Sequence, residues 1–344
     1  MIRLNNDYCY GAHERVLKAI ADINGKAYPG YGLDECCQAA SEAIKSVCKT
    51  PEADIHFLTG GTQTNLTVIS SALRPYQSAL CASTGHINVH ETGAIENCGF
   101  KVVGLSSIDG KITAAQVDEA AEEYENSDIP EHITEPKLVY ISFPTELGTL
   151  YSKKELTEIS LACKKHNLYL YIDGARLSYG LAGENNDVSI EDIASLSDVF
   201  FIGGTKCGLL FGEAVVITNP QLKPFFRHYV KQKGAMLAKG WLLGIQFYEM
   251  FKDGLYFETG KNAVNLALRL KEAFRKKGIQ LSADSPTNQQ FVIMKDSDLE
   301  KLSKNYVYEY NRRIDQSNSE VRFCTSWATK DEEIEKLIKD IEEL

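Results

Sequence analysis

Two charged side chains follow hydrophobic segments that predict buried strands of an α/β sheet. Lys206 comes after the segment Asp198–Ile202 and a small-residue turn, and Asp173 comes directly after the segment Leu168–Ile172. The carboxyl ends of parallel strands meet at one edge of a sheet, where ligands bind, so this amine and this carboxylate are expected there. Burial makes a lysine amine a usable nucleophile, whereas a buried carboxylate needs a cationic partner. Considered alone, each residue has a second interpretation. Lys206 is then a solvated loop lysine, and Asp173 is a helix cap that pairs with Arg176 at the surface.

A glycine turn is a third candidate for chemistry. The segment Asp54–Leu58 reads as a strand, and Thr59-Gly-Gly61-Thr62 then leads into a helical pattern. Free backbone N–H groups at a helix N-terminus can bind a phosphate, and the hydroxyl of Thr62 can add a donor. The turn does not match a Walker A loop and the chain has no GxGxxG fingerprint, which disfavours ATP and NAD. The alternative is a tight turn that uses glycine only for its backbone freedom.

A histidine follows another short strand segment. His86 comes after Ser78–Ala82, where an imidazole can stack on the flat ring of a cofactor, and Glu91 is near enough in sequence to reach the same site. The alternative is a core histidine with satisfied hydrogen bonds.

The order of these features is more specific than any one of them. Four features follow one another at strand ends: a phosphate turn, a ring-stacking histidine, an aspartate with an arginine three residues later, and a lysine after threonine. Fold-type I pyridoxal 5'-phosphate (PLP) enzymes have the same order. In such enzymes the lysine forms a Schiff base with the cofactor and the aspartate holds the proton of its pyridine nitrogen. We therefore predict PLP as the cofactor.

The same segments resemble the low-specificity threonine aldolases of the beta-eliminating lyase/threonine aldolase group. The resemblance rests on Tyr31-Gly-Leu-Asp-Glu, Thr59-Gly-Gly-Thr-Gln-Thr-Asn-Leu, Ile172-Asp-Gly-Ala-Arg and Gly204-Thr-Lys-Cys-Gly, and it extends to Val321-Arg-Phe near the C-terminus. It implies an aldehyde-lyase that cleaves a 2-amino-3-hydroxy acid, of the threonine, allo-threonine or phenylserine type, to glycine and an aldehyde. The alternatives are a β-eliminating or other PLP-dependent lyase on the same fold, and a non-catalytic homologue.

The resemblance also implies a role for each matching residue. Lys206 binds the cofactor covalently, Asp173 pairs with the pyridine nitrogen, and His86 stacks on the ring. Gly61 and Thr62 contact the phosphate. Arg176 and Arg322 contact the substrate carboxylate, with Asn6 at the position where the family usually has serine. Tyr31 contacts the active site of a neighbouring subunit. This last contact implies a homodimer or homotetramer with shared active sites.

One position departs from the family pattern. The common threonine aldolases carry Thr-His-Asn-Gly after the strand that precedes the aspartate, whereas this chain reads Pro144-Thr-Glu146-Leu-Gly. Together with the segment from His86 to Glu96, this looks closer to the phenylserine aldolases. Glu146 is a candidate for a catalytic or for a supporting role, with equal weight. The base that removes the β-hydroxyl proton is His86, Glu146 or a water molecule.

Alternating strand and helix patterns must position these side chains. Further strand segments are Lys101–Leu105, Lys137–Ser142 and Glu213–Ile217, and helical segments include Gln63–Leu73, Ala114–Glu125 and Lys153–His166. This order predicts a largely parallel sheet covered by helices. With the resemblance, it implies an α/β fold of the fold-type I PLP-dependent transferase kind, with a mostly parallel seven-stranded sheet and helices on both faces.

A second, smaller part is expected at the C-terminus. We predict a large PLP-binding domain over residues 1–248 and an α+β domain over residues 249–344, joined by one long helix from Trp241 to about Lys277. Strands near Gln290–Met294 and Val321–Thr325 and a final helix over Asp331–Glu343 complete the expected domain.

The composition excludes several other classes of protein. A length of 344 residues suggests about two domains, and a formal charge of −10, from 37 Lys+Arg against 47 Asp+Glu, argues against nucleic acid as a partner. No apolar stretch reaches the roughly 18 residues of a membrane span and no signal peptide pattern is present, so we expect a cytoplasmic protein. The resemblance to the threonine aldolases implies a small amino-acid substrate. The nine cysteines lack a CxxC pair, which favours reduced thiols and predicts no metal site.

Overall fold

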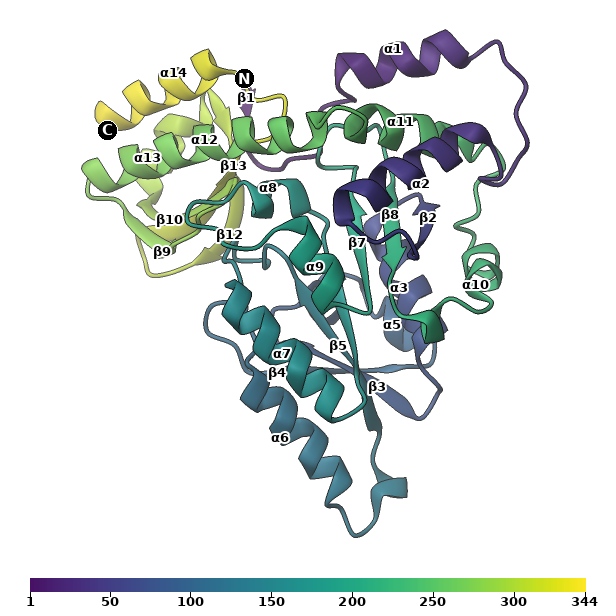
Figure 1. Cartoon of the computed structure of the whole chain (residues 1–344). Coiled ribbons are helices and arrows are strands. Elements are labelled where there is room, and N and C mark those ends of the chain that lie inside the picture. The colour runs from purple at the N-terminus through teal and green to yellow at the C-terminus, as the bar shows by residue number, and fades with distance from the viewer.

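A seven-stranded sheet organises the larger part of the chain in the computed structural model, which describes residues 1–344 (Figure 1). The strands lie in the order β2-β8-β7-β6-β5-β3-β4. β8 is antiparallel to both of its neighbours, and all other adjacent pairs are parallel. The bounds are Asp54–Leu58 (β2), Gln77–Ala82 (β3), Lys101–Leu105 (β4), Glu135–Ser142 (β5), Tyr169–Asp173 (β6), Val199–Gly203 (β7) and Glu213–Ile217 (β8). The predicted mostly parallel seven-stranded sheet is confirmed, with strand ends that differ by a residue or two.

Side chains alternate along each strand, so the sheet buries both of its faces. On β6, Leu170 and Ile172 belong to one hydrophobic cluster, whereas Tyr171 between them belongs to another. The first cluster is covered by α2 (Glu35–Cys48), α6 (Ala114–Glu125), α7 (Lys153–Lys165), α9 (Ile190–Leu196) and α11 (Trp241–Phe251). The second is covered by α3 (Gly61–Ala72), α5 (Ala94–Asn97) and α10 (Phe226–Gln232). Helices therefore cover both faces, as predicted.

Two helices on one face, α6 and α7, begin in a different way from α3 on the other face. Thr113 and Ser152 start α6 and α7 with reciprocal capping boxes, which satisfy the first N–H groups of each helix. In contrast, α3 begins after Gly60 without any side-chain cap. Its first N–H groups are therefore free for a ligand.

A second sheet dominates the C-terminal part. It has four antiparallel strands in the order β12-β13-β10-β9, packed against α12 and α14 around a separate hydrophobic cluster. Its elements are α12 (Leu255–Lys276), β9 (Gln280–Ala283), β10 (Gln289–Lys295), α13 (Asp296–Ser303), β11 (Tyr306–Val307), β12 (Glu309–Arg313), β13 (Asn318–Cys324) and α14 (Asp331–Glu342). β10, β13 and α14 were predicted, whereas β9, β11, β12 and α13 were not.

The N-terminus is joined to this C-terminal part. The short strand β1 (Ile2–Arg3) pairs in parallel with β11, and the N–H of Leu4 donates to the carbonyl of Val307 (2.8 Å). The chain then runs through α1 (Glu14–Ile23) to the large sheet. A boundary between residues 248 and 249 stays a prediction.

The single long helix expected from Trp241 to about Lys277 is wrong. The segment forms two helices, α11 and α12, which are separated at Gly254. Gly254 has a φ of 84°, a left-handed backbone conformation that glycine adopts without strain. The buried apolar pattern continues on both sides of this break, which explains why the pattern alone did not reveal it.

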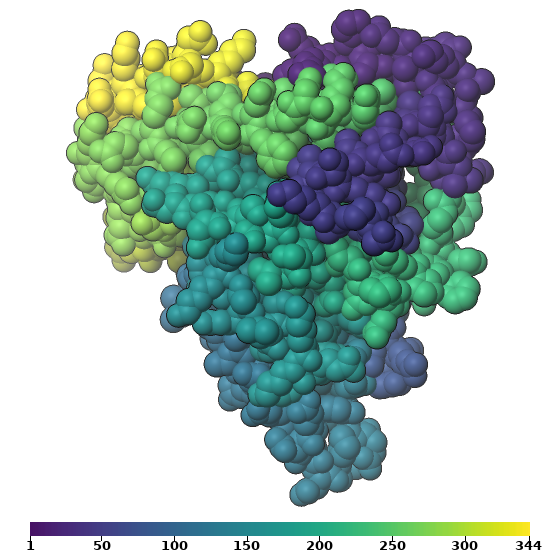
Figure 2. Space-filling view, viewed as in Figure 1, coloured from purple at the N-terminus to yellow at the C-terminus, as the bar shows by residue number.

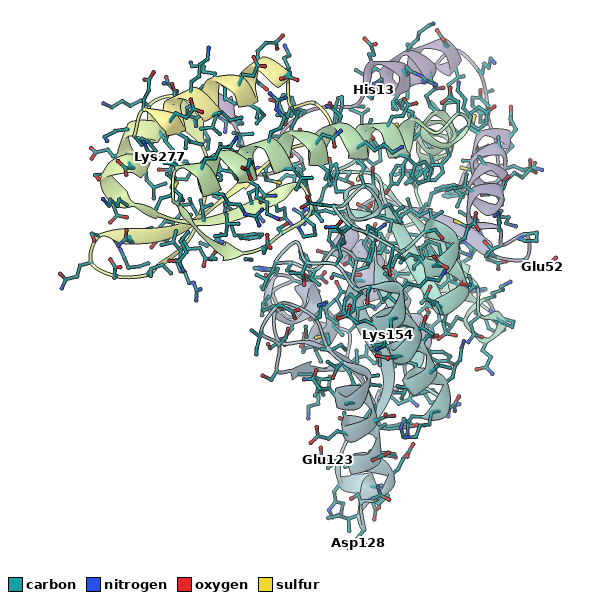
Figure 3. All side chains as sticks on the ribbon, turned by 60° about the vertical axis from the view of Figure 1, so that its left-hand side comes forward. His13, Glu52, Glu123, Asp128, Lys154 and Lys277 are labelled. Atoms are coloured by element: carbon teal, nitrogen blue, oxygen red, sulfur yellow. The ribbon has the colours of Figure 1, made fainter.

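The molecule narrows toward one end, which is coloured blue in the space-filling view (Figure 2). Figure 3 places Glu123 and Asp128 at this narrow end and Lys277 on the C-terminal part, away from it. No helix combines the length and the hydrophobicity that crossing a bilayer requires.

Candidate active site

The carboxyl ends of β5, β6 and β7 and the start of α3 surround one pocket. This is the edge at which open α/β sheets bind ligands. The structure brings together six predicted residues in its lining: Gly61, His86, Glu146, Asp173, Arg176 and Lys206. The other lining residues are Asn65, Ser142, Pro144, Thr145 and Ala175. Segments far apart in the sequence therefore meet in one place.

Lys206 stands in the loop after β7, and its amine has no partner. The Tyr179 hydroxyl donates to the Lys206 carbonyl (2.6 Å), which fixes the backbone, while Nζ makes no hydrogen bond or ion pair. A Cβ at Gly203 would lie 2.3 Å from the Ala175 carbonyl oxygen, so the strand end can approach the neighbouring loop only as glycine. Burial, and then the charge of Arg176, lowers the pKa of Lys206. An amine in this state is a usable nucleophile.

Asp173 ends β6, and three donors fix its carboxylate. Oδ2 accepts hydrogen bonds from the Tyr140 hydroxyl (2.5 Å) and the Asn65 amide (3.2 Å), and Oδ1 accepts from the Ala175 N–H (2.9 Å). The residue is only 5% exposed. A carboxylate offers about four acceptor positions, so capacity is left for one further donor.

His86 is joined to the same network through a buried carboxylate. His86 Nδ1 lies 2.7 Å from Oε1 of Glu91, whose side chain is fully buried. The Asn65 amide donates to both Glu91 (2.7 Å) and Asp173, and its oxygen accepts from the Tyr171 hydroxyl (2.7 Å). Burial lowers the pKa of His86, but the hydrogen bond to Glu91 and the charge of Asp173 outweigh it, so the net pKa is raised. These contacts hold the imidazole in one orientation at the pocket.

Glu146 follows β5, with one carboxylate oxygen bonded and the other free. Oε1 accepts hydrogen bonds from the His86 N–H (2.9 Å) and the Ser142 hydroxyl (2.6 Å), and Oε2 makes none. Burial raises the pKa of Glu146. A carboxylate with a raised pKa is a better proton acceptor near neutral pH.

The first turn of α3 offers unpaired donors beside this group of side chains. The N–H groups of Gly61 and Thr62 have no acceptor, and Thr62 itself is exposed. A Cβ at Gly60 or Gly61 would meet no atom within 4 Å, so the space beside the turn is open. PLP needs free N–H groups for its phosphate, a fixed carboxylate for its ring nitrogen and an unpaired amine for its aldehyde. The residues of the pocket therefore fit this cofactor.

Arg176 lines the pocket but shares its guanidinium with Asp7. Its Nε and Nη2 donate to the two Asp7 oxygens (2.7 and 3.0 Å), and the Asn288 amide donates to Oδ2 of Asp7 (2.9 Å). Burial opposes the charged form of Asp7, which is 1% exposed, but Arg176 and Lys206 hold its pKa below the usual range. The Nη1 group of Arg176 makes no hydrogen bond and remains available to a second carboxylate.

Arg322 and Asn6 lie outside the pocket lining. Arg322 extends from β13, where Nη1 donates to the Gln289 side chain (3.0 Å) and Nη2 to the Asn5 carbonyl (3.1 Å). Its Nε is buried without a partner. Since Asn5 and Asp7 flank Asn6, one N-terminal segment contacts both arginines that were predicted to hold the substrate carboxylate.

Tyr31 does not reach the pocket of its own chain. It is 46% exposed and lines a separate groove between α2 and α10. The Lys231 ammonium lies 4.8 Å from its ring centroid, and Arg227 donates to its carbonyl (3.1 Å). A contact with the site of a neighbouring subunit stays a prediction.

Asn65 and Asp7 are parts of the site that sequence reasoning missed. Asn65 lies four residues after Gly61 on α3, and this spacing places both residues on one helix face, which is a signal that the sequence does contain. Asp7 lies 169 positions from Arg176, and no local pattern connects them.

Comparisons with known proteins agree with the geometry. Residues 17–297 match the family model described as beta-eliminating lyase. A low-specificity L-threonine aldolase of a Pseudomonas species is 30% identical over 314 residues, which are 90% of this chain and 88% of that protein. Two solved structures superpose well. A threonine aldolase of Leishmania major has a TM-score of 0.97 and 43% identity, covering 100% of this chain and 99% of that chain.

A putative L-allo-threonine aldolase of Listeria monocytogenes has a TM-score of 0.77 and covers 99% of this chain and 96% of that chain. At 17% identity it is informative for the fold alone. These structures confirm the predicted fold-type I architecture. The extent of the family match and of the similarity to the Pseudomonas protein shows that this chain belongs to the beta-eliminating lyase family, and its motifs resemble the threonine aldolases within it.

Proposed function

We propose that this protein is a PLP-dependent carbon–carbon lyase that cleaves a 2-amino-3-hydroxy acid of the threonine type to glycine and an aldehyde. One observation carries the proposal: the unpaired amine of Lys206 shares a pocket with the fixed carboxylate of Asp173 and the open start of α3. The similarity to threonine aldolases supports the choice of the bond that breaks. Allo-threonine and phenylserine belong to the same chemical class and are substrates to compare with threonine.

The cofactor would be held at four points. The N–H groups of Gly61 and Thr62 would bind the phosphate, Asp173 would bind the ring nitrogen and His86 would cover the ring. The amine of Lys206 would bond to the aldehyde carbon with loss of water. When bound, PLP supplies an electron sink for the charge that the breaking Cα–Cβ bond leaves on Cα. Asp173 favours this by keeping a proton on the ring nitrogen, since its orientation is already fixed by neighbouring donors.

The two arginines would hold the substrate carboxylate. Arg176 offers its free Nη1 group, and Arg322 approaches from β13 beside Asn6. Fixing the carboxylate and the amino group of the substrate determines which bond at Cα lies perpendicular to the ring. The arginines therefore select the Cα–Cβ bond for cleavage.

Glu146 is the group to which we assign the proton of the β-hydroxyl. Its Oε2 has no hydrogen bond, it lines the pocket, and burial raises its pKa toward the working range of a general base. His86 is already engaged by Glu91 and would lie against the ring. A water molecule is the alternative base, and the kinetics of Glu146→Gln separate the two.

The activity is tested by assaying two pairs of products in parallel. The proposal predicts glycine and acetaldehyde from threonine, whereas a β-eliminating lyase would release ammonia and a 2-oxo acid. Lys206→Ala should lose the yellow colour of the bound cofactor and at least about 10³-fold in cleavage rate, because the nucleophile is gone. A Lys206→Ala protein that keeps both normal colour and aldol cleavage would contradict the proposal.

We also propose that the protein acts as a homodimer or homotetramer in which Tyr31 completes the site of a neighbour. The exposure of Tyr31 and its absence from the lining of its own pocket support this arrangement. Mixing Tyr31→Ala subunits with Lys206→Ala subunits should then recover activity, because each mixed pair contains one complete site. No recovery after verified subunit exchange would contradict shared sites.

A cytoplasmic location is the last part of the proposal. All nine cysteines are free thiols, and seven of them are buried. Thiols that stay reduced are typical of the cytoplasm. Fractionation of the producing cells tests the location.

A further inference from the structure

A buried carboxylate lies at the base of the Lys206 loop and has no role in the mechanism described above. Glu213 is the first residue of β8 and pairs in register with Gly203, the last residue of β7. The loop between these two residues carries Lys206. Glu213 is only 4% exposed, so its charge is not screened by bulk water.

Glu213 closes this loop with both of its carboxylate oxygens. Oε2 accepts from the Gly204 N–H (3.0 Å) and Oε1 from the Thr205 hydroxyl (2.8 Å). The Thr205 hydroxyl oxygen accepts in turn from the Gly212 N–H (3.0 Å). Glu213 therefore fixes Thr205, the residue directly before Lys206.

The loop has little room to absorb a shift of this carboxylate. A Cβ at Gly204 would lie 2.6 Å from the Gly212 carbonyl oxygen, so the two ends of the loop are in close backbone contact. The N–H groups of Gly204 and Thr205 both donate to that same oxygen (3.0 and 3.1 Å). A shift of the Glu213 carboxylate is therefore expected to move the loop that carries Lys206.

Glu213 and Lys206 also influence each other through their charges. Burial raises the pKa of Glu213 to about 7, and the positive charge of Lys206 opposes this effect. In the other direction, burial and Arg176 lower the pKa of Lys206, whereas negative charge on Glu213 raises it. The other titratable groups near one or both of them are Asp7, His86, Tyr171, Asp173, Cys207 and Tyr256.

We propose that Glu213 is a positioning residue for Lys206, which fixes the loop that carries the amine and supplies a buried negative charge that favours the protonated amine. Together with Asp7 and Asp173, Glu213 then sets the pH at which Lys206 gives up its proton. The inference deepens the proposed function and rests on it only for the part that concerns PLP. Its main test therefore uses the protein without cofactor.

The first experiment measures the proton affinity of Lys206 in the apoenzyme. Acetylation of Lys206 by acetic anhydride is followed by peptide mass spectrometry as a function of pH. Glu213→Gln keeps the shape of the side chain and removes the charge, so the midpoint of Lys206 reactivity should move to lower pH by on the order of one unit. Glu249→Gln removes a buried carboxylate from α11, bonded to Arg15 and Lys252, and should leave the midpoint unchanged.

An unchanged midpoint in a folded Glu213→Gln protein overturns the proposal, as does an equal shift in Glu249→Gln. The reciprocal variant Lys206→Met keeps the proposal testable if Glu213→Gln does not fold. Loss of the lysine charge should raise the pKa of Glu213, so its protonated carboxyl band in the infrared spectrum should persist to higher pH than in the parent. The band is assigned to Glu213 by the change of its frequency in the double variant Lys206→Met/Glu213→Asp. A band with the same pH midpoint as in the parent overturns the proposal.

The holoenzyme separates this inference from the proposed function. With PLP bound, the pH midpoint of the yellow band should also fall in Glu213→Gln, because the same nitrogen carries the proton. A shift in the acetylation midpoint with no cofactor colour at any pH, even in the parent, would support the role of Glu213 and contradict the PLP function. The opposite result is a parent protein with a cofactor colour that depends on Lys206, while the acetylation midpoint and the midpoint of the yellow band are both unchanged in Glu213→Gln. That result would support the PLP function and contradict the role of Glu213.

Discussion

The two sides of the active-site pocket are built in different ways. On the side proposed for the cofactor, Asp173 is held by donors from β5, α3 and its own loop, and one acceptor position of its carboxylate is left open. On the side proposed for the substrate carboxylate, Arg176 is already paired with Asp7, and Arg322, which lies outside the pocket lining, donates to Gln289 and to a backbone carbonyl. The cofactor side is preorganised, whereas the carboxylate side is occupied by the chain's own groups.

The difference follows from where the residues come from. The cofactor side belongs to one sheet and the helix next to it, so its geometry is fixed by the core. The carboxylate side joins the N-terminal segment, the large sheet and β13 of the second sheet. Substrate must add to, or replace, contacts that already exist there. We therefore expect changes on the cofactor side to lower kcat and changes on the carboxylate side to raise KM.

After the loss already expected for Lys206→Ala, the next largest effect is expected for Asp173→Asn. An amide has the same shape as the carboxylate but cannot hold a proton on the ring nitrogen, so kcat should fall about 10²–10³-fold. Steady-state kinetics with saturating PLP measure this. A rise in KM with kcat retained would show that Asp173 acts only in binding and would remove the contrast between the two sides.

A smaller loss is expected for Glu146→Gln. Because Glu146 is assigned the β-hydroxyl proton, kcat should fall about 10²-fold and the acidic limb of the pH profile should disappear. Burial raises the pKa of this group, so the parent should lose activity as the pH falls through that raised value. If the variant keeps the acidic limb and most of kcat, Glu146 is a support for His86 and water is the base.

On the carboxylate side, Arg322→Ala should raise KM about tenfold for every amino acid tested and change kcat little, because one charged hydrogen-bond donor is lost. Arg312→Ala on the neighbouring strand β12 is the matched control, since its exposed side chain pairs only with Glu320. Unchanged kinetics in Arg322→Ala would remove that arginine from the site.

The smallest effect concerns the support of His86. Removing the carboxylate in Glu91→Gln should lower the pKa of His86, which NMR titration of the imidazole measures. The folded protein raises the pKa of His86, so the ion pair of His86 with Glu91 contributes its full stabilisation at pH values below the unfolded pKa of about 6.5. This contribution is lost as the pH rises through the pKa of His86 in the folded protein. Glu96→Gln, exposed on α5, is the control. An equal pKa shift in both variants would argue against a specific contact.

Local sequence patterns were sufficient for the cofactor side. A buried strand that ends in small residues is recognisable from neighbours in the sequence, and the structure has Asp173 and Lys206 at such strand ends, in one pocket. The glycine turn before α3 and the strand before His86 are local signals of the same kind. The sheet follows from them because strands in an α/β order have few ways to pair.

The carboxylate side could not be predicted in the same way. Asp7 and Arg176 are 169 positions apart, and Asn5 and Arg322 are 317 apart, so only the folded chain shows that they are bonded. The break at Gly254 was hidden because apolar periodicity continues through it. Glu213 was seen only as the start of a strand, and its role depends on a loop that folds back onto it.

The central claim is that Lys206 is the covalent attachment point of PLP on a preorganised cofactor side. The most direct test is to incubate the protein with PLP, reduce it with sodium borohydride, and map the modified lysine by peptide mass spectrometry. The account predicts a phosphopyridoxyl group on Lys206 in stoichiometric amount and on no other lysine. A protein that carries the group elsewhere, or that remains unmodified after saturation with PLP, would contradict it.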